Sequence, residues 1–523
     1  MRKAIIILTK KEMIRAGIYL VFLFLTAWTH AQEKPNILLI TVDDMNWNSV
    51  GAYGNTIDQI TPNIDHLAKG GVRFENAYVT ASNCSPSRVS IQTGLFPHQS
   101  GARGFYYIDD SQIPTIATNL KAAGYFTGVI NKGADTDPSP DFKKYWDQRL
   151  GFAKGDKYDS KVYREQSTKF YKRVKGSNKP FYLVVNIADP HKPFYNDPTA
   201  VKRGFDQTAP SRIIDASEVE IPSFLPNLPA VRNDLRNYYN SVKRADDCVG
   251  AIMESLLASG NLDNTLVIFL SDHGMPFPFA KSSVYENGLR TPLIMSWPGQ
   301  IESGTLAKDQ IVSSIDIYPT FLDAAGLSMP TGNNYTGTSL LEIVDGSTTE
   351  ERMAFGNFDE NASGYPSPMR GVISEKWNYV FNAWGSGNQT FKSAAMYHAS
   401  FKAMAKSKDP EIRQRVAMLK HRVVEELYDL ENDPGCTKNL INQPQYSEVA
   451  EKLRQAMKNH MIATDDYLLE AFNVKNNMEK LDQFMEQQKQ LSMERAQSIN
   501  WKRPSNMAGS SKENTGLYLQ KRP

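Results

Sequence analysis

Residues 36–44 read Asn36-Ile37-Leu38-Leu39-Ile40-Thr41-Val42-Asp43-Asp44, an apolar run that ends in two carboxylates. A run of aliphatic and β-branched residues of this length is typical of a strand buried on both faces, as in a parallel sheet. Open α/β sheets gather their reactive loops at the carboxyl ends of the strands. The segment therefore predicts a central strand with acidic groups at its functional end.

Further apolar runs share this character and alternate with helix-like stretches. The runs are Phe126–Ile130, Phe181–Ile187, Leu266–Leu270 and Leu293–Trp297. The helix-like stretches are Asn63–Lys69, Thr115–Ala123, Ser160–Val174 and Val231–Ala258. This order predicts an α/β domain over residues 32–345, with a large, mainly parallel central sheet flanked by helices.

The residue pattern changes after Val344, from long alternating strand-like and helix-like stretches to shorter runs. Short runs at Met369–Ser374, Asn378–Asn382 and Glu426–Leu430, with a helix-like stretch at Glu411–Val424, predict a smaller subdomain over residues 346–477 with a short antiparallel sheet. Residues 478–523 are rich in Gln, Lys, Met and Ser, and are predicted to form a helix that runs into a mobile polar tail.

The N-terminus has the order of an export signal. Lys10, Lys11 and Arg15 precede the apolar run Ala16–Trp28, and small residues follow before Gln32. We expect residues 1–31 to be removed and the mature protein to be periplasmic or secreted, without a membrane partner. The alternative is a membrane anchor, but the run is shorter than the ~20 residues that a spanning helix needs.

The bulk composition suits a folded soluble protein. The chain has 523 residues, 41% hydrophobic and 22% charged, with a formal net charge of +2. Such a balance indicates no nucleic-acid partner, and an anionic substrate would need local cations. Three cysteines are too few for a disulfide framework. Cys248 and Cys436 either pair or stay buried, and Cys84 needs another explanation.

The sharpest motif is Cys84-Ser85-Pro86-Ser87-Arg88, continued by Ser90, Thr93 and Gly94. It resembles the hallmark of type I, formylglycine-dependent sulfatases, Cys-x-Pro-x-Arg followed by Thr-Gly. In that family a formylglycine-generating or radical maturase enzyme oxidises the cysteine to formylglycine (3-oxoalanine), whose hydrate attacks sulfur. The segment also predicts a helix start, where backbone amides favour negative charge. The alternative is a buried free thiol near a proline turn.

A metal site is predicted at the strand ends. Asp43 and Asp44 suit a hard divalent cation, although alone they could form only a turn and a helix cap. Asp272 and His273 follow the run Leu266–Leu270 and add a third carboxylate at another strand end. The resemblance implies that these four residues bind one calcium ion together with the modified Cys84.

The resemblance also implies the cations that hold sulfate. Arg88 would orient the diol. Lys281 begins a segment that resembles the family's Lys-x-x-x-Tyr-Glu-x-Gly, whose Lys binds sulfate. Lys132 lies in Gly124–Ala134, which resembles the family's second signature, Gly-Tyr-x-Thr-x-x-x-Gly-Lys with a His two residues after the Lys. In that signature the usual Gly is Asn131, and the usual His, which helps to release sulfate, is Ala134. We therefore expect another base or water at the release step.

Two histidines are candidates for contact with the substrate. His191 lies at the end of the predicted strand Phe181–Ile187 and titrates near neutrality, so it is the candidate general acid, with a purely structural role as the alternative. His98 is near Cys84 in the sequence, and is predicted either to contact substrate and replace the missing base or to be structural.

The resemblance covers the chain to about Asn439 and leans toward the heparan N-sulfatase (sulfamidase) branch, through Ser271–Pro278 and Ile221–Pro229. It implies an alkaline-phosphatase-like sulfatase fold. The leading hypothesis is a sulfatase that acts on a sulfated polysaccharide, such as algal ulvan or a glycosaminoglycan. The alternatives are a sulfamidase, a phosphohydrolase of the alkaline phosphatase superfamily, or a non-catalytic glycan-binding relative.

Overall fold

The computed structural model describes residues 34–498, apart from 107, 109–111, 154–155, 205–207 and 349–350. The predicted signal peptide and the predicted tail beyond Ser498 lie outside the described residues. Within the described ranges, every helix is too short or too polar to cross a membrane.

An eight-stranded sheet is the centre of the described structure. Its strand order is β4-β3-β5-β1-β6-β7-β2-β8, and β7 runs antiparallel to both neighbours while the other pairs are parallel. The strands are β1 Asn36–Val42, β2 Val72–Tyr78, β3 Phe126–Ile130, β4 Gln148–Leu150, β5 Phe181–Asn186, β6 Thr265–Ser271, β7 Leu293–Ser296 and β8 Thr305–Ser313. The predicted mainly parallel sheet is confirmed.

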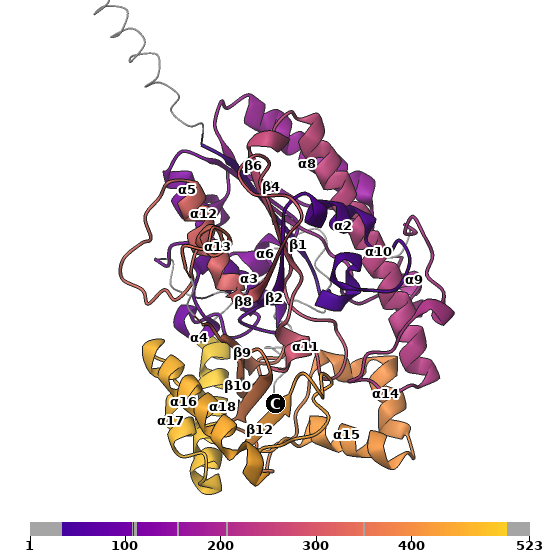
Figure 1. The fold of residues 1–523 in the computed structure, drawn as a ribbon, viewed down its shortest axis with the longest axis vertical. Helices are drawn as coiled ribbons and strands as arrows, with labels where there is room; N and C mark the ends of the chain where they lie inside the picture. The colour runs from indigo at the N-terminus through magenta and orange to yellow at the C-terminus, as the bar shows by residue number, and fades with distance from the viewer. Residues whose placement is uncertain are drawn as a thin grey trace, which may run out of the picture. The chain divides into compact units, whose positions relative to one another are not determined.

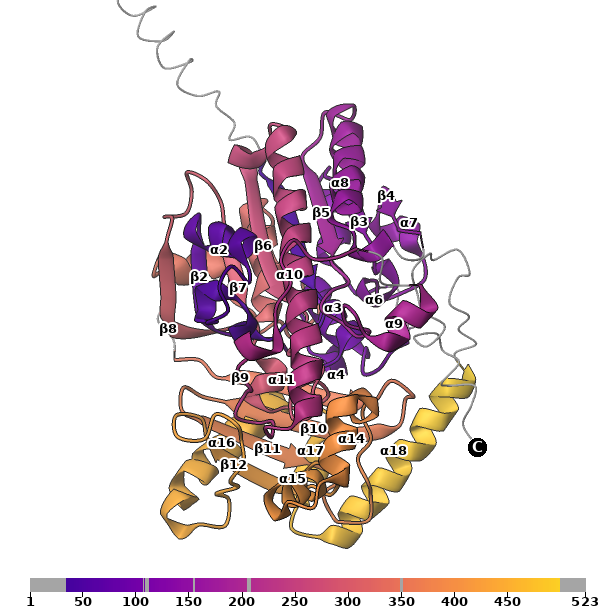
Figure 2. The same cartoon turned by 90° about the vertical axis from the view of Figure 1, so that its right-hand side faces the viewer.

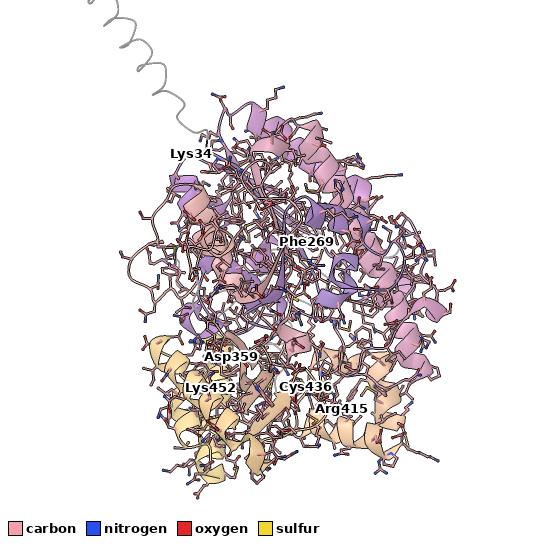
Figure 3. The ribbon with its side chains drawn as sticks, in the orientation of Figure 1. Lys34, Phe269, Asp359, Arg415, Cys436 and Lys452 are labelled. Atoms are coloured by element: carbon pink, nitrogen blue, oxygen red, sulfur yellow. The ribbon has the colours of Figure 1, made fainter. Side chains whose placement is uncertain are left out.

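The side chains of β1 alternate between two hydrophobic cores. Ile37 and Leu39 belong to the core on one face of the sheet, whereas Leu38, Ile40 and Val42 belong to the core on the other. Because successive residues of a strand point to opposite faces, a continuous apolar run is what a sheet covered on both sides requires. The same alternation places Phe269 of β6 in the interior, where Figure 3 labels it.

Helices cover both faces of this sheet (Figure 1). On one side lie α2 (Pro62–Lys69), α8 (Ser160–Lys175) and α10 (Pro229–Ala258); on the other lie α5 (Ile116–Ala122), α12 (Ile317–Ala324) and α13 (Leu340–Val344). Shorter helices are α4 Pro97–Ser100, α6 Gly133–Thr136, α7 Phe142–Tyr145, α9 Pro198–Arg203 and α11 Glu286–Leu289. The four helices predicted in this region are confirmed to within two residues at each end.

The helix α3 (Cys84–Thr93) is unusual because all of its residues are buried, including Arg88 and several serines. Polar residues are rarely buried unless they have partners or a function. Its first helical residue is Cys84, as the motif predicted.

A second, antiparallel sheet follows, with the order β12-β11-β10-β9 (Figure 2). Its strands are β9 Ala354–Glu360, β10 Pro366–Ile373, β11 Trp377–Asn382 and β12 Glu425–Asp429. The helices around it are α14 Ala399–Lys406, α15 Pro410–Lys420, α16 Ser447–Ala463, α17 Leu469–Asn473 and α18 Met478–Ser498. The short antiparallel sheet is confirmed. The helix predicted to reach Val424 ends at Lys420, because the Val424 carbonyl accepts a hydrogen bond from Asn382 of β11.

The two sheets belong to one compact unit, formed by the described residues from Asn36 onward. The Tyr285 hydroxyl donates to Glu426 at 2.6 Å across their junction. The predicted boundary at residue 345 falls between α13 and β9. All three cysteines lie in the described part of the chain and are buried and unpaired, so Cys248 and Cys436 form no disulfide.

A buried carboxyl makes the stability of the fold depend on pH. Burial raises the pKa of Asp137 to about 7, although Trp146 donates a hydrogen bond to it at 2.6 Å. The folded state therefore holds a proton that the unfolded state has lost above pH 4, and stability falls as pH rises from about 4 to 7.

We expect Asp137→Asn to abolish this dependence. As the pH rises from 5 to 8, the free energy of unfolding of the wild type should fall by on the order of 3 kcal/mol more than that of the variant. Denaturant unfolding at several pH values measures the difference. A difference that does not change with pH would show that Asp137 is ionised in the folded protein.

Candidate active site

Two neighbouring strands, β1 and β6, place polar side chains at the same end of the large sheet. Asp43 and Asp44 follow β1, and Asp272 and His273 lie at the end of β6. Because β1 and β6 are adjacent and parallel, their carboxyl ends coincide. The Asp44 amide donates to Asp272 Oδ1 at 3.0 Å, which fixes the two segments together.

The residues predicted to bind metal are brought together. Ligand atoms of Asp43, Asp44 and Asp272 all lie within 4.8 Å of one another, and so do those of Asp44, Cys84 and His273. Neither oxygen of Asp43 accepts a hydrogen bond of good geometry, although both are buried. Both oxygens instead face cationic side chains, those of Lys132 and Arg88, and carboxylate oxygens in such a position also suit a divalent metal ion.

The orientation of His273 also suits a cation. Its Nδ1 lies 2.9 Å from the Gly274 carbonyl, which can only accept a hydrogen bond, so Nδ1 carries the hydrogen. The lone pair of Nε2 then faces the site, 3.2 Å from Asp44 Oδ1 and 3.3 Å from Cys84 Sγ. A ring held from behind by a carbonyl is typical of metal-binding histidines. The set fits a hard divalent cation, with His273 as its one nitrogen donor.

Arg88 is held rigidly beneath this cluster. Its Nε and Nη2 lie 3.0 and 2.9 Å from Asp272 Oδ2, and its Nη1 donates to Thr41 and Asn186, both at 2.6 Å. Thr41 in turn donates to Asn186 at 2.7 Å, so β1 and β5 lock the guanidinium in place. Sequence reasoning missed Thr41 and Asn186, because neither stands in a recognisable motif.

Two lysines reach the cluster from other loops. Lys132 Nζ forms a salt bridge with Asp43, and Lys281 Nζ donates to the two oxygens of Asp44 at 2.7 and 2.9 Å. Lys281 Nζ also lies 3.4 Å from Cys84 Sγ. Three carboxylates therefore face three permanent cations around the cysteine.

These cations decide the ionisation of the carboxylates. Burial alone would raise the pKa of Asp43, but the charges of Lys132 and Arg88, and of His191 when it is protonated, outweigh burial and hold the pKa well below its usual range. Burial also raises the pKa of Asp44, but the charge of Lys281 outweighs burial, so the net pKa of Asp44 is lowered.

The thiol of Cys84 is poorly suited to act as a nucleophile itself. Burial and the charge of Asp43 raise its pKa well above the ordinary value. Reactive cysteines instead have lowered pKa values, because the thiolate is the attacking species. This arrangement is consistent with chemistry that needs a modified side chain at position 84.

His191 lies at the rim of the cluster, with Nε2 3.9 Å from Asp44 Oδ2. Its Nδ1 contacts the Lys192 carbonyl, so Nδ1 carries a hydrogen and Nε2 is the nitrogen that can gain or lose a proton. Desolvation lowers the pKa of His191 to about 4, although Asp44 favours the proton. The ring is therefore neutral near pH 7 before an anion binds.

The contacts of His98 favour the structural role that the sequence left open, rather than contact with substrate. Its side chain is only 1% exposed, and Nδ1 lies 2.8 Å from the Asn357 amide and 3.7 Å from Asp466. His98 belongs to α4 and contacts Asn357 of β9 in the smaller sheet. Its ring also stacks beside Phe96. Although His98 is close to Cys84 in the sequence, its side chain contacts Asn357 and Asp466 instead of the cluster around Cys84.

The departures in the second signature have different consequences. Asn131 adopts a left-handed conformation with φ 62°, which explains why Asn replaces Gly there: both tolerate positive φ. Ala134 is buried in α6 and offers no titratable group. A cation that the motifs did not predict, Lys157, interacts electrostatically with Lys132 and Asp43, and burial lowers its pKa to about 8.

Glycine packing explains part of the motif around Asp272. A Cβ at Gly274 would lie 1.9 Å from the Asn287 carbonyl oxygen, so only glycine fits. This close approach joins the loop that carries His273 to the segment that follows Lys281.

Comparison with known proteins identifies this arrangement. Residues 35–327 match the Sulfatase family, and residues 272–384 match the family described as N-sulphoglucosamine sulphohydrolase, C-terminal. The chain belongs to the sulfatase family. As a sulfatase it is a sulfuric ester hydrolase, and the family implies a formylglycine at the motif cysteine beside a metal site.

Named sulfatases resemble this one over most of its length. Human N-sulphoglucosamine sulphohydrolase is 30% identical over 82% of this chain and 90% of its own. An ulvan-active sulfatase of Formosa agariphila is 26% identical over 83% of this chain and 76% of its own. The solved structure of a 2-O GAG sulfatase has a TM-score of 0.61 and 20% identity, covering 83% of this sulfatase and 93% of that chain.

The backbone at Asn131 generates a testable prediction. Asn131→Gly should keep the conformation and therefore most of the sulfatase activity. Asn131→Val should reduce kcat/KM more than tenfold, because a β-branched residue at positive φ costs roughly 1–2 kcal/mol and displaces Lys132.

Asn178 is the matched control, since it is exposed, also has positive φ at 51°, and lies in the turn after α8. Asn178→Val should lower the melting temperature without changing kcat/KM. Equal activities of the two valine variants would show that the Asn131 backbone does not position Lys132.

Proposed function

We propose that this sulfatase hydrolyses sulfate esters on a sulfated polysaccharide or its oligosaccharides, after export to the periplasm or the exterior. The observation that carries the proposal is the placement of Cys84. It opens a fully buried helix and faces three carboxylates and the lysine Lys281. No simpler role explains so many buried charges around one thiol.

Two groups would complete the site. Formylglycine at position 84 would supply a geminal diol, one hydroxyl of which attacks sulfur while the other later expels sulfate by re-forming the aldehyde. Calcium, held by Asp43, Asp44, Asp272 and His273 with residue 84, would act as a Lewis acid on the sulfate oxygens.

The permanent cations bind and orient the sulfate group. Lys132 and Lys281 contact Asp43 and Asp44, so each can turn to a sulfate oxygen once a metal ion takes over the carboxylates. Arg88 stays fixed by Thr41 and Asn186 and orients residue 84. Arg88 is thus a preorganised charge that need not move during the reaction, whereas the two lysines first exchange a carboxylate for a sulfate oxygen.

His191 is the proposed general acid. Its Nε2 faces the cluster while Nδ1 is held by the Lys192 carbonyl, so a proton gained at Nε2 points into the site. A bound sulfate group brings negative charge close to the ring and favours the protonated form. The ring can then protonate the sugar oxygen as the bond to sulfur breaks.

The carbohydrate class is supported by the relatives. Similar proteins are named for action on N-sulphoglucosamine, on ulvan and on the 2-O position of a glycosaminoglycan. A sulfamidase is the second candidate, favoured by the match of residues 272–384 to the C-terminal part of that family. Release of sulfate from N-sulfoglucosamine, glucosamine 6-sulfate and ulvan oligosaccharides distinguishes the two.

The modification of Cys84 is directly testable. After expression with a maturase, mass spectrometry should show the Cys84 peptide with one oxygen in place of sulfur and two hydrogens. Cys84→Ala should abolish sulfate release while the melting temperature stays near that of the wild type. Cys248→Ala, which removes another buried free thiol, is the control and should remain active. An active enzyme whose Cys84 peptide is an unmodified thiol would overturn the proposal.

Metal removal gives a second test. A chelator should abolish sulfate release and lower the melting temperature, because an ion that binds only the folded state stabilises it. Calcium should restore both properties. Full activity in the presence of excess chelator would exclude the metal from the reaction.

A further inference from the structure

The buried face of α10 carries a line of residues with polar groups. The line consists of Asp234, Tyr238, Ser241 and Arg244, which are spaced four, three and three residues apart and are all buried. Residues at these spacings lie on one face of a helix. Figure 2 shows α10 running along the large sheet toward the smaller subdomain. Because buried polar residues usually have partners, the contacts of this line indicate what it holds.

The partners of this line lie in residues 189–195, the loop that carries His191. Three contacts attach the second half of the loop to α10: Lys192 Nζ to Asp234 Oδ1 at 3.8 Å, the Phe194 ring edge-on to Tyr238 with the centroids 5.7 Å apart, and the Tyr195 amide to Ser241 Oγ at 2.7 Å. The α10 residues in these contacts occupy successive turns. This half of the loop therefore cannot shift without breaking contacts along the helix.

Arg244 holds the first half of the loop through Asp189. Its Nε donates to Asp189 Oδ2 at 2.6 Å, and its Nη2 donates to Oδ1 at 3.1 Å. The two side chains are 1% and 0% exposed. Two parallel hydrogen bonds fix the orientation of a carboxylate as well as its distance, which the single ammonium of a lysine cannot do.

The guanidinium of Arg244 is itself fixed by further contacts. Its Nη1 donates to the Thr208 carbonyl at 3.0 Å, and the group lies 4.4 and 5.4 Å from the ring centroids of Tyr158 and Tyr195. A buried ion pair adds little stability compared with apolar side chains of the same volume. The pair is therefore better explained by the position that it imposes on Asp189 than by stability.

Asp189 connects this ion pair to the charged cluster. Its carbonyl accepts a hydrogen bond from the Asp43 amide at 3.1 Å, and it stands two residues before His191 in the chain. The Nε2 atom of His191 lies 3.9 Å from Asp44 Oδ2. The side chain proposed to donate the proton is thus held between Arg244, before it in the loop, and the three α10 contacts after it.

We propose that Arg244 is a positioning residue for the general acid: through Asp189 it holds the loop so that Nε2 of His191 faces the leaving oxygen. This inference rests on the proposed function of His191. When the bond between sulfur and the sugar oxygen breaks, the proton on Nε2 passes to that oxygen. Arg244 neither gives this proton nor binds substrate, but keeps the ring in line for the transfer.

The leaving group separates positioning from a general structural role. The alcohol oxygen of a sugar is a poor leaving group that needs the proton, whereas an aryl oxide leaves readily as the anion. We expect Arg244→Lys, which keeps the charge but loses the paired hydrogen bonds, to lower kcat/KM for a sugar sulfate about tenfold. For 4-methylumbelliferyl sulfate, kcat/KM should stay within about twofold of the wild type.

Steady-state kinetics measure both substrates on the same preparation of each variant. The sugar sulfate is whichever of N-sulfoglucosamine, glucosamine 6-sulfate and ulvan oligosaccharides the wild type cleaves fastest. The ratio of the two kcat/KM values does not depend on the fraction of folded enzyme, so partial misfolding cannot imitate the expected result. A ratio equal to that of the wild type would overturn the inference. A wild type that cleaves only the aryl sulfate would instead contradict the proposed carbohydrate substrate.

A double substitution shows whether Arg244 acts through His191. His191→Ala should itself lower the ratio, and by more than Arg244→Lys does. Adding Arg244→Lys to His191→Ala should change kcat/KM for the sugar sulfate less than about twofold, because the positioned group is already absent. A further loss as large as in the wild-type background would show that Arg244 acts independently of His191, against the inference. An unchanged ratio in His191→Ala would contradict the proposed general acid.

Lys243→Arg is the matched control on the same helix. Lys243 is 4% exposed, and its Nζ lies 2.9 Å from Asp246 Oδ2 in another buried ion pair. That pair contacts α2, because Asp246 accepts hydrogen bonds from the Asn63 and Ile64 amides at 3.0 and 2.9 Å. The substitution should lower the melting temperature and leave the ratio unchanged. A ratio that falls as far as in Arg244→Lys would show that any disturbance of α10 has this effect, and would remove the special role of Arg244.

Discussion

Three carboxylates are buried side by side at the carboxyl ends of two central strands, and the rest of the structure depends on how their charge is neutralised. Asp43, Asp44 and Asp272 repel one another, and burial deprives them of water. Arg88 and the two lysines at the site neutralise this charge. Such an arrangement is unstable unless every member is paired, which explains why so many segments converge there.

The scaffold around these charges is built from backbone constraints as much as from side chains. Arg88 is buried in α3 and held by Thr41 and Asn186, so it cannot follow the substrate as a surface arginine would. The left-handed residue Asn131 exchanges amide hydrogen bonds with Asn186, which ties the Lys132 loop to the same strand. Charge and rigidity are therefore supplied by one connected network.

The two sheets contribute differently to the charged cluster around Cys84. Its side chains lie at strand ends of the large sheet, in α3 or in the loops that follow these strands. His98 illustrates the difference between sequence distance and spatial distance: it is fourteen positions from Cys84 but is buried against Asn357 and Asp466.

The sequence alone determined the parallel sheet, because the alternating faces of runs such as Asn36–Val42 must both be buried. The residues around Cys84 were identified by the resemblance of their motifs to those of sulfatases, and the expected helix start at Cys84 agrees with the structure. The short or partly exposed strands β2, β4 and β8 of the large sheet were missed, because local pattern is weak where burial is incomplete. Only the tertiary structure showed the contacts of Thr41, Asn186 and His98, because contacts between distant segments leave no local signal in the chain.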